Sequence, residues 1–531
     1  MTAIIISQLV GQAADDSVIP ERYAYTMRLG AIDVGSNSVH MLIADVNRRG
    51  DIEVVDRAKE MVRLGRKSFI TGRLTEESME LTVRSLSYFK RLLKIRRVNR
   101  MRAVATSAVR EARNRAQFIE RVTNETGIAL QVIPGEEEAR LIFRAARHAL
   151  GLEGGPHLLV DVGGGSVELV LVRDGQPLSM HSVKLGVARL TEQFLTGDPP
   201  TASQRKRLEK HLEGEIGELM RTARKAGVVD AIGTSGTINT LVAMARASRG
   251  EELGRLHGAS ASAIEVARIS REICEAETRA RIELPGIDAK RADLMPAAGI
   301  LADYIMRRSE AAELIACTWA MREGLLLDLA EVDNRAGSVE VRRRSVEALA
   351  RRFNGANEHG KTVARLALAL FDGTAAALGL PAIARELLEY AALLHDVGHS
   401  IDHDRHNRHS YYLIKNGEML GFEPNEIELI AQVARGHRKQ APSLDAPELR
   451  VLAAGKRKIV RGLAALIRVA DALDRSHFGV VKELKVSYSP GCVTITVGAN
   501  GYKPDLELWT CERRTELLAK LMDRRVVLEQ R

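Results

Sequence analysis

The order of apolar and polar positions predicts the same arrangement twice in the first 325 residues. An apolar run ends in an aspartate, a loop of small residues follows, and a second apolar run begins at once, first over 31–46 and again over 159–173. Apolar runs of this length, bounded by glycine, are typical of buried strands. Each loop is therefore expected to be a β-hairpin turn. The repeat predicts a duplicated α/β fold with a cleft between its halves.

Strand and helix patterns alternate between and after these loops. Thr75-Glu-Glu is a typical helix start, and an amphipathic helix is expected from there to about Lys94. Further strands are expected at 51–56, 102–106, 129–133 and 228–232, and a further helix from Glu136. From about 325 to 478 the chain has a nearly continuous helical pattern. Two strands, at 483–487 and 492–496, and a helix over 513–523 end it.

These patterns divide the chain into five segments. They are a disordered extension over 1–27, α/β units over 28–149 and 150–325, a helical domain over 326–480 and a small α+β domain over 481–531. At 531 residues, the chain is too long for a single hydrophobic core.

The two hairpin loops have the composition of a phosphate site. Asp33 and Asp161 end the preceding strands and can hold a divalent cation against phosphate oxygens. Glycine has no Cβ, which lets backbone N–H groups approach an anion at Gly35, Gly163, Gly164 and Gly165. The direct return to strand excludes Walker and dinucleotide-binding loops, where a helix starts at once. A single loop of this kind would be better explained as an ordinary glycine-rich hairpin turn. Two matched loops are better explained as a phosphate site.

Composition narrows the classes of partner. Aromatic residues make up 4% of the chain, which argues against large stacking surfaces for single-stranded nucleic acid. The net charge of +9 favours polyanionic partners, although a generally arginine-rich surface explains it equally well. The four cysteines form no Cys-x-x-Cys pair, which fits a reducing cytosol. No stretch approaches the roughly 20 apolar residues of a membrane span, so we expect a cytoplasmic protein that binds neither nucleic acid nor membrane.

Six motifs follow one another along the chain. They are Asp33-Val-Gly-Ser-Asn-Ser38, Ala105-Thr-Ser-Ala-Val-Arg110, Gly135-Glu-Glu-Glu-Ala-Arg140, Asp161-Val-Gly-Gly-Gly-Ser-Val-Glu168, Gly233-Thr-Ser-Gly236 and Met321-Arg-Glu-Gly324. Taken in this order, they resemble the exopolyphosphatase / guanosine pentaphosphate phosphohydrolase (Ppx/GppA) phosphatase family. The resemblance implies duplicated ribonuclease-H-like domains of the actin-like ATPase superfamily. An all-α HD-like domain and a small α+β appendage would follow them.

The resemblance also implies a reaction, the hydrolysis of a terminal phosphoryl group from inorganic polyphosphate or from the 5′ end of guanosine pentaphosphate. It assigns the general base to Glu138, and a carboxylate can accept a proton from an attacking water without forming a covalent intermediate. Without the resemblance, Glu136, Glu137 and Glu138 are equally well explained as acids at a helix N-terminus.

The same resemblance assigns Mg²⁺ to Asp161 and Glu168, with Asp33 nearby, and these hard oxygen ligands suit that ion. Arg110 is expected to end a strand in the cleft and to bind phosphate with its planar fork, unless it pairs with Glu111 or a nearby surface acid. Further phosphate contacts are expected from Ser36, Asn37, Ser38, Ser166, Gly233, Thr234, Ser235 and Gly236.

A second candidate site lies in the helical region, which holds eight of the chain's 14 histidines between His359 and His477. The order His359, His395-Asp396 and Asp471 resembles that of metal-dependent HD phosphohydrolases. Neighbouring histidines that could widen the site or line a pH-sensitive phosphate groove are His403, His406, His409 and His437. A hydrogen-bonded helix-packing cluster explains the same residues equally well.

The leading hypothesis is a Mg²⁺-dependent exopolyphosphatase, expected as a homodimer. Guanosine pentaphosphate, and with it the tetraphosphate, is the alternative partner. A kinase or ATPase of the same superfamily would use the same loops, but the Glu138 motif and the helical tail favour hydrolysis. A non-catalytic polyphosphate or alarmone sensor is a third hypothesis, against which the complete set of acids argues.

Overall fold

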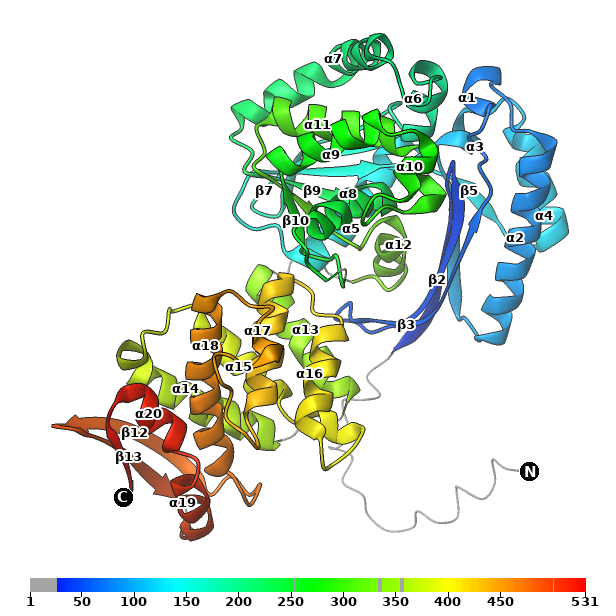
Figure 1. The fold of residues 1–531 in the computed structure, drawn as a ribbon. Coiled ribbons are helices and arrows are strands. Elements are labelled where there is room, and N and C mark those ends of the chain that lie inside the picture. Colours follow the sequence, from blue (N-terminus) through cyan, green and yellow to red (C-terminus); the bar gives the residue numbers. More distant parts are fainter. Residues whose placement is uncertain (1–25, 253, 333–336, 354–357, 500) are drawn as a thin grey trace, which may run out of the picture.

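The computed structural model describes residues 26–252, 254–332, 337–353, 358–499 and 501–531. Two α/β units lie side by side, and a helical unit ending in a small sheet packs below them in the view of Figure 1. The predicted disorder of 1–27 falls almost wholly outside these residues, and β1 already begins at Met27. None of the helices in the described ranges is long and apolar enough to cross a membrane.

The first unit is built on a five-stranded sheet of order β3-β2-β1-β4-β5. β1 pairs antiparallel with β2 and parallel with β4, which in turn pairs parallel with β5. The strands are β1 (Met27–Val34), β2 (Ser38–Val46), β3 (Ile52–Met61), β4 (Arg100–Ala105) and β5 (Leu130–Val132). The helices are α1 (Ser68–Thr71), α2 (Glu76–Ile95), α3 (Ser107–Glu111), α4 (Arg115–Thr126) and α5 (Gly135–Leu150).

The second unit repeats this order in the strands β8-β7-β6-β9-β11 and adds β10 as an antiparallel edge. The strands are β6 (His157–Val162), β7 (Val167–Arg173), β8 (Gln176–Val183), β9 (Asp230–Thr234), β10 (Ser260–Ser262) and β11 (Glu313–Ala316). The helices are α6 (Val187–Phe194), α7 (Ala202–Lys225), α8 (Ser235–Ser248), α9 (Ala263–Glu275), α10 (Thr278–Ile282) and α11 (Met295–Ser309). The repeated order confirms the predicted duplicated α/β fold.

Local sequence explains where the main elements begin. Thr75 caps α2, because its side chain accepts a hydrogen bond from the Ser78 backbone N–H. Pro134 precedes α5, whose first turn carries three glutamates that favour the positive end of the helix dipole. Both glycine loops return directly to strand, as predicted, at β2 and β7.

Helix α12 (Met321–Leu329) ties the two units together, so the predicted boundary after residue 325 falls inside it. Leu325, Leu326 and Leu327 are fully buried in the core shared by α5 and β1. A Cβ on Gly324 would lie 2.1 Å from the Leu141 carbonyl oxygen, so the close approach of α12 to α5 requires glycine. Tertiary packing, which the local pattern does not show, thus places α12 with the first unit.

The helical unit is followed by a three-stranded sheet that shares its hydrophobic core. The helices are α13 (Ser338–Arg352), α14 (Glu358–Leu378), α15 (Ala384–Leu394), α16 (His406–Asn416), α17 (Pro424–Gly436) and α18 (Ala454–Ala472). The sheet order is β12-β13-β14, and Val493, Ile495 and Val497 of the central strand face the helices. The α+β segment therefore has no core of its own.

The C-terminal end differs from the expected pattern. In place of one helix over 513–523, α19 (Asp505–Glu512) and α20 (Glu516–Met522) are separate, and β14 (Arg525–Gln530) follows. β14 pairs parallel with β13 (Cys492–Ala499), which itself pairs antiparallel with β12 (Val481–Ser489). A short edge strand with polar ends has little apolar signal in the sequence, and its pairing with β13 stabilises it.

Candidate active site

The turns after β1 and β6 face each other and form a cleft of about 160 Å³ between the two α/β units. Gly35 donates its N–H to Ser38 O at 3.1 Å, and Gly163 donates to Ser166 O at 3.0 Å, so the two turns have matching geometry. Thirteen of the predicted site residues line the cleft: Asp33, Gly35, Ser36, Asn37, Ser38, Glu138, Asp161, Gly163, Gly164, Gly165, Ser166, Ser235 and Gly236.

The other predicted residues of this site lie behind the cleft wall. The Thr234 hydroxyl donates a hydrogen bond to Asp161, and Gly233 packs against Ile238. Glu168 stands opposite Asp161 in the β6–β7 pair, with 1% of its surface exposed. These residues orient or surround the lining groups.

Glu138 differs from its two neighbours on α5 by facing the cleft. It is buried, whereas Glu136 is exposed and Glu137 pairs with Arg140 at 2.8 Å. Burial raises the pKa of Glu138 to about 8, Arg110 opposes that rise, and Asp33 adds to it. The structure thus singles out, by position, the glutamate that the resemblance selects.

Arg110 lies in the short helix α3, so its expected place at the end of a strand is wrong. Its Nη1 donates to the Ile133 carbonyl at 2.9 Å and to Glu138 Oε2 at 3.1 Å. The acid with which it pairs is therefore Glu138, and the pair links α3 to α5. It is largely screened from water because both side chains are mostly buried.

Four carboxylates meet at the cleft with raised pKa values. Burial raises the pKa of Asp33 to about 7, with Asp161 adding to the rise, and it also raises the pKa of Asp161. Burial and the nearby Glu138 and Asp161 carboxylates hold the pKa of Glu168 well above its usual range. Asp33 Oδ1 and Glu168 Oε2 are buried and make no hydrogen bond within the described ranges. Unsatisfied hard oxygens of this kind fit a divalent cation.

Basic groups that the sequence analysis did not select also line the cleft. They include Arg322, from the quoted Met321-Arg-Glu-Gly324 motif, and Arg291, whose Nε donates to Asp288 at 3.2 Å. His40 also lines it, with Nε2 2.7 Å from Ser38 Oγ. Burial and the nearby Arg322 depress the pKa of His40 and keep its ring neutral. The Met321-Arg-Glu-Gly324 motif was a usable signal for Arg322, and the closeness of His40 to the first glycine loop was a usable signal for His40. Arg291 is brought to the cleft only by folding.

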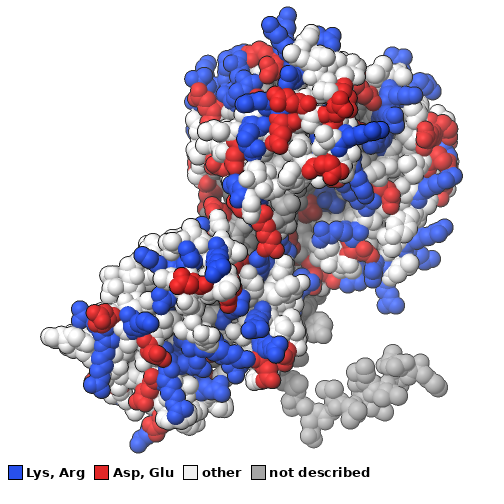
Figure 2. Space-filling model, in the orientation of Figure 1, with Lys and Arg blue, Asp and Glu red and all other residues white. Residues whose placement is uncertain are grey.

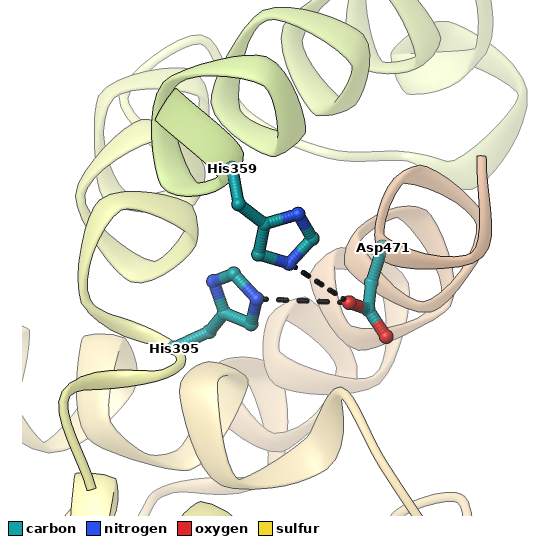
Figure 3. A group of neighbouring side chains, drawn as sticks. All are labelled: His359, His395 and Asp471. Carbon is teal, nitrogen blue, oxygen red and sulfur yellow. Dashed lines mark ion pairs between the residues drawn. The ribbon is translucent and has the colours of Figure 1, made fainter. Parts of the chain in front are cut away.

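The predicted second site is also brought together, in the helical unit. His359 on α14 and Asp471 on α18 lie 3.4 Å apart, and His395 at the end of α15 lies 3.7 Å from Asp471 (Figure 3). Asp396 follows directly and lies 3.7 Å from His359. His406 and His437 join the cluster, whereas His403 lies at its exposed edge.

Charge on the visible face gives no single basic groove. Figure 2 shows lysine and arginine intermixed with aspartate and glutamate over the α/β units. The net charge of +9 therefore fits both a polyanionic partner and a generally arginine-rich surface. In the cleft itself, positive charge comes from Arg291 and Arg322.

Comparison with known proteins places the chain in a family. The model of the Ppx/GppA phosphatase family matches residues 42–332, and that of Ppx/GppA phosphatase, domain III, matches 341–500. Exopolyphosphatase 1 of Mycobacterium tuberculosis is 34% identical over 334 residues, covering 62% of this chain and 95% of that protein. The Mycobacterium leprae protein of the same name is 34% identical over 305 residues, covering 57% and 89%.

Solved structures of the same family resemble this chain as well. The Aquifex aeolicus member of the Ppx/GppA family is 31% identical with a TM-score of 0.51, covering 58% of this chain and 98% of that one. An exopolyphosphatase from Cytophaga hutchinsonii is 28% identical with a TM-score of 0.54, covering 58% and 100%. Their folds agree with the duplicated α/β arrangement described above. With family models matching both its α/β units and its helical unit, the chain belongs to the Ppx/GppA phosphatase family.

Proposed function

We propose that the cleft hydrolyses the terminal phosphoanhydride bond of inorganic polyphosphate, with water activated by Glu138. The observation that carries this proposal is the position of Glu138, buried and facing two matched phosphate loops. The relatives named exopolyphosphatase support the substrate class. The enzyme is accordingly a hydrolase of phosphoanhydride bonds.

The loops bind the terminal phosphate through backbone N–H groups and small hydroxyl side chains. Ser36 and Ser166 are held beside the glycines, and a Cβ on Gly165 would lie 2.7 Å from Ser36 Oγ. The close approach of the loops leaves room for phosphate oxygens and little else. Arg322 and Arg291 at the cleft wall add positive charge for the following phosphates.

Asp161, Glu168 and Asp33 would hold the divalent cation, and Mg²⁺ is the ion that their oxygen atoms suit best. When bound, Mg²⁺ neutralises charge on the transferred phosphoryl group. Without it, burial is the main cause of the raised pKa values of Asp33 and Glu168, and repulsion between the clustered carboxylates adds to the rise.

In the reaction step, the water oxygen bonds to the terminal phosphorus as the bond from phosphorus to the bridging oxygen breaks. Glu138 takes the proton from the water, and the shortened chain leaves with the electron pair of the broken bond. The Arg110 guanidinium, 3.1 Å away, favours the ionised form of Glu138 and orients its carboxylate.

Guanosine pentaphosphate presents the same terminal anhydride and is the second candidate substrate. The same step would act on it, so the loops alone do not distinguish the two. A cytoplasmic homodimer and, as a non-catalytic alternative, a polyphosphate sensor also remain predictions from the sequence.

Glu138→Gln tests the proposal. We expect phosphate release from polyphosphate to fall by about 10²–10⁴-fold while polyphosphate binding is retained, as for loss of a general base. Glu136→Gln, on the exposed side of the same turn, is the matched control and should keep full activity. Unchanged release in Glu138→Gln would exclude the base assignment. Assays on long polyphosphate, short polyphosphate and guanosine pentaphosphate, each with and without Mg²⁺, identify the substrate and the ion.

A further inference from the structure

The imidazole rings of the helical unit converge on one carboxylate, that of Asp396. Its Oδ1 lies 3.3 Å from His406 Nε2 and 3.6 Å from the Nε2 atoms of His395 and His437. Its Oδ2 lies 3.5 Å from His399 Nε2 and 3.7 Å from His359 Nε2. Five rings from separate elements thus point the same nitrogen toward a shared centre.

One group of donor atoms consists of His359, His395 and Asp471, whose ligand atoms all lie within 4.8 Å of one another (Figure 3). Asp471 Oδ1 is 3.4 Å from one ring and 3.7 Å from the other. With metal–ligand bonds of about 2.0–2.2 Å, two ligands of one ion stand about 3–3.5 Å apart. The observed spacing is therefore close to that of ligands around a single ion.

A second group lies on the other side of the same carboxylate. His406 Nε2 and His437 Nε2 are 3.1 Å apart, and both are near Asp396 Oδ1. His399 borders this group on its solvent side. Because Asp396 is within 3.7 Å of members of both groups, it is placed to bridge two ions.

The opposite ring nitrogen, Nδ1, is already engaged in each of the four buried histidines. Its acceptors are the Asp474 carboxylate at 2.8 Å from His359, and the carbonyls of Ala392 at 2.7 Å from His395, His403 at 2.8 Å from His406 and Ala434 at 2.6 Å from His437. His406 Nδ1 is also 3.2 Å from Arg438 Nη1, which only donates, so these two contacts do not fix the tautomer of His406. A carbonyl only accepts, so in His395 and His437 Nδ1 carries the hydrogen and Nε2 carries the lone pair of the neutral ring. This is the tautomer that a metal ligand needs.

The Nε2 atoms of His359 and His395 are buried and make no hydrogen bond in the part of the chain that the structure describes. Their side chains are 3% and 1% exposed. Buried polar atoms without a partner are costly, and a metal ion would satisfy both. A purely hydrogen-bonded cluster would instead need a hydrogen on one of the Nε2 atoms of His406 and His437, which lie 3.1 Å apart.

We propose that the helical unit binds a pair of divalent transition-metal ions bridged by Asp396. His359, His395 and Asp471 hold the first ion, and His406 and His437 hold the second. Imidazole-rich ligands favour Mn²⁺, Fe²⁺, Co²⁺ or Zn²⁺ over Mg²⁺, so this centre differs in metal class from the cleft. The proposal does not depend on the chemistry of the cleft.

Metal content and electron paramagnetic resonance of the full chain test this, with Mn²⁺ as the probe. After metal stripping and reloading in excess Mg²⁺, which occupies the cleft carboxylates, we expect about two tightly held Mn²⁺ per chain and the spectrum of a coupled ion pair. His437→Ala should retain about one Mn²⁺ with the spectrum of an isolated ion. His409→Ala is the matched control, because His409 is on the same helix as His406 but outside the metal groups.

Circular dichroism of each variant establishes that it is folded, and the half-exposed His399→Ala gives a second variant with little risk of unfolding. A single Mn²⁺ in the wild-type chain, or two ions without coupling, would overturn the bridged pair. Equal Mn²⁺ content in His437→Ala, His399→Ala and His409→Ala would show adventitious binding only. Absence of tight Mn²⁺, Co²⁺ and Zn²⁺ binding would leave a hydrogen-bonded packing cluster.

Discussion

Arg110 Nη1 lies 3.1 Å from Glu138 Oε2, so the arginine expected to bind phosphate is hydrogen-bonded to the proposed general base. The pair links α3 to α5 at the cleft wall. Arginine holds a positive charge at every relevant pH and so stabilises the ionised carboxylate. Burial and neighbouring acids act in the opposite direction, and the pKa of Glu138 is the balance of the two.

Arg110→Met should therefore raise the pKa of Glu138 further. Because the base must be deprotonated to accept a proton, the acidic limb of the pH profile of kcat/KM should move to higher pH. Activity at pH 7 should fall more than activity at pH 9. Arg113→Met, on an exposed neighbouring arginine, is the control. An unshifted acidic limb would contradict a role for Arg110 in setting the base.

Glu168→Gln should stabilise the metal-free protein and weaken its response to Mg²⁺. The folded-state pKa of Glu168 is raised, so its ionisation destabilises the fold progressively as pH rises above the unfolded value of about 4.3, and glutamine removes that cost. Mg²⁺ should raise the Tm of the wild type more than that of the variant.

Scanning calorimetry at pH 8, with and without Mg²⁺, measures both effects. Glu136→Gln should behave like the wild type, because its side chain is exposed. Equal Mg²⁺ shifts in all three proteins would mean that Glu168 is not a ligand.

Gly324→Ala should destabilise the junction between α12 and α5. The added Cβ would lie 2.1 Å from the Leu141 carbonyl oxygen, and overpacking of this kind costs about 1–3 kcal/mol. Gly214→Ala, in the exposed middle of α7, has nothing near its Cβ position and should instead stabilise by up to about 1 kcal/mol. Denaturant unfolding measures the free energy of unfolding of both variants. An unchanged free energy of unfolding in Gly324→Ala would contradict the close packing of α12 against α5.

Arg189 of the second unit bridges to the first across the mouth of the cleft. Its guanidinium lies 4.1 Å from the Phe69 ring centroid and 2.7 Å from Glu111, and its Nε donates to Gly165 O at 3.0 Å. Arg189→Met should loosen the two loops and raise KM for polyphosphate more than it lowers kcat. Lys184 also pairs with Glu111 but is exposed, so Lys184→Met should raise KM less than Arg189→Met does. Equal kinetic parameters in both variants would argue against this bridge.

Much of the α/β fold could be predicted because its signals are local. The runs around Gly35 and Gly163 return to strand within a few residues, and the proline and glutamates at the start of α5 mark a helix in any context. The family resemblance then selected Glu138, and the structure places it at the cleft. Arg110 was misplaced because a five-residue helix after a strand has no periodicity to detect.

The sequence by itself determined the duplicated succession of strands and helices along the chain, the composition of the phosphate loops and the presence of a histidine-rich helical region. Only the tertiary structure decided that α12 belongs to the first unit, that Arg291 reaches the cleft, and that His406 and His437 meet at Asp396. These contacts join residues far apart in the chain, and the packing that makes them depends on side-chain shape and burial across whole elements. Periodicity records which face of an element is buried, but not what it is buried against.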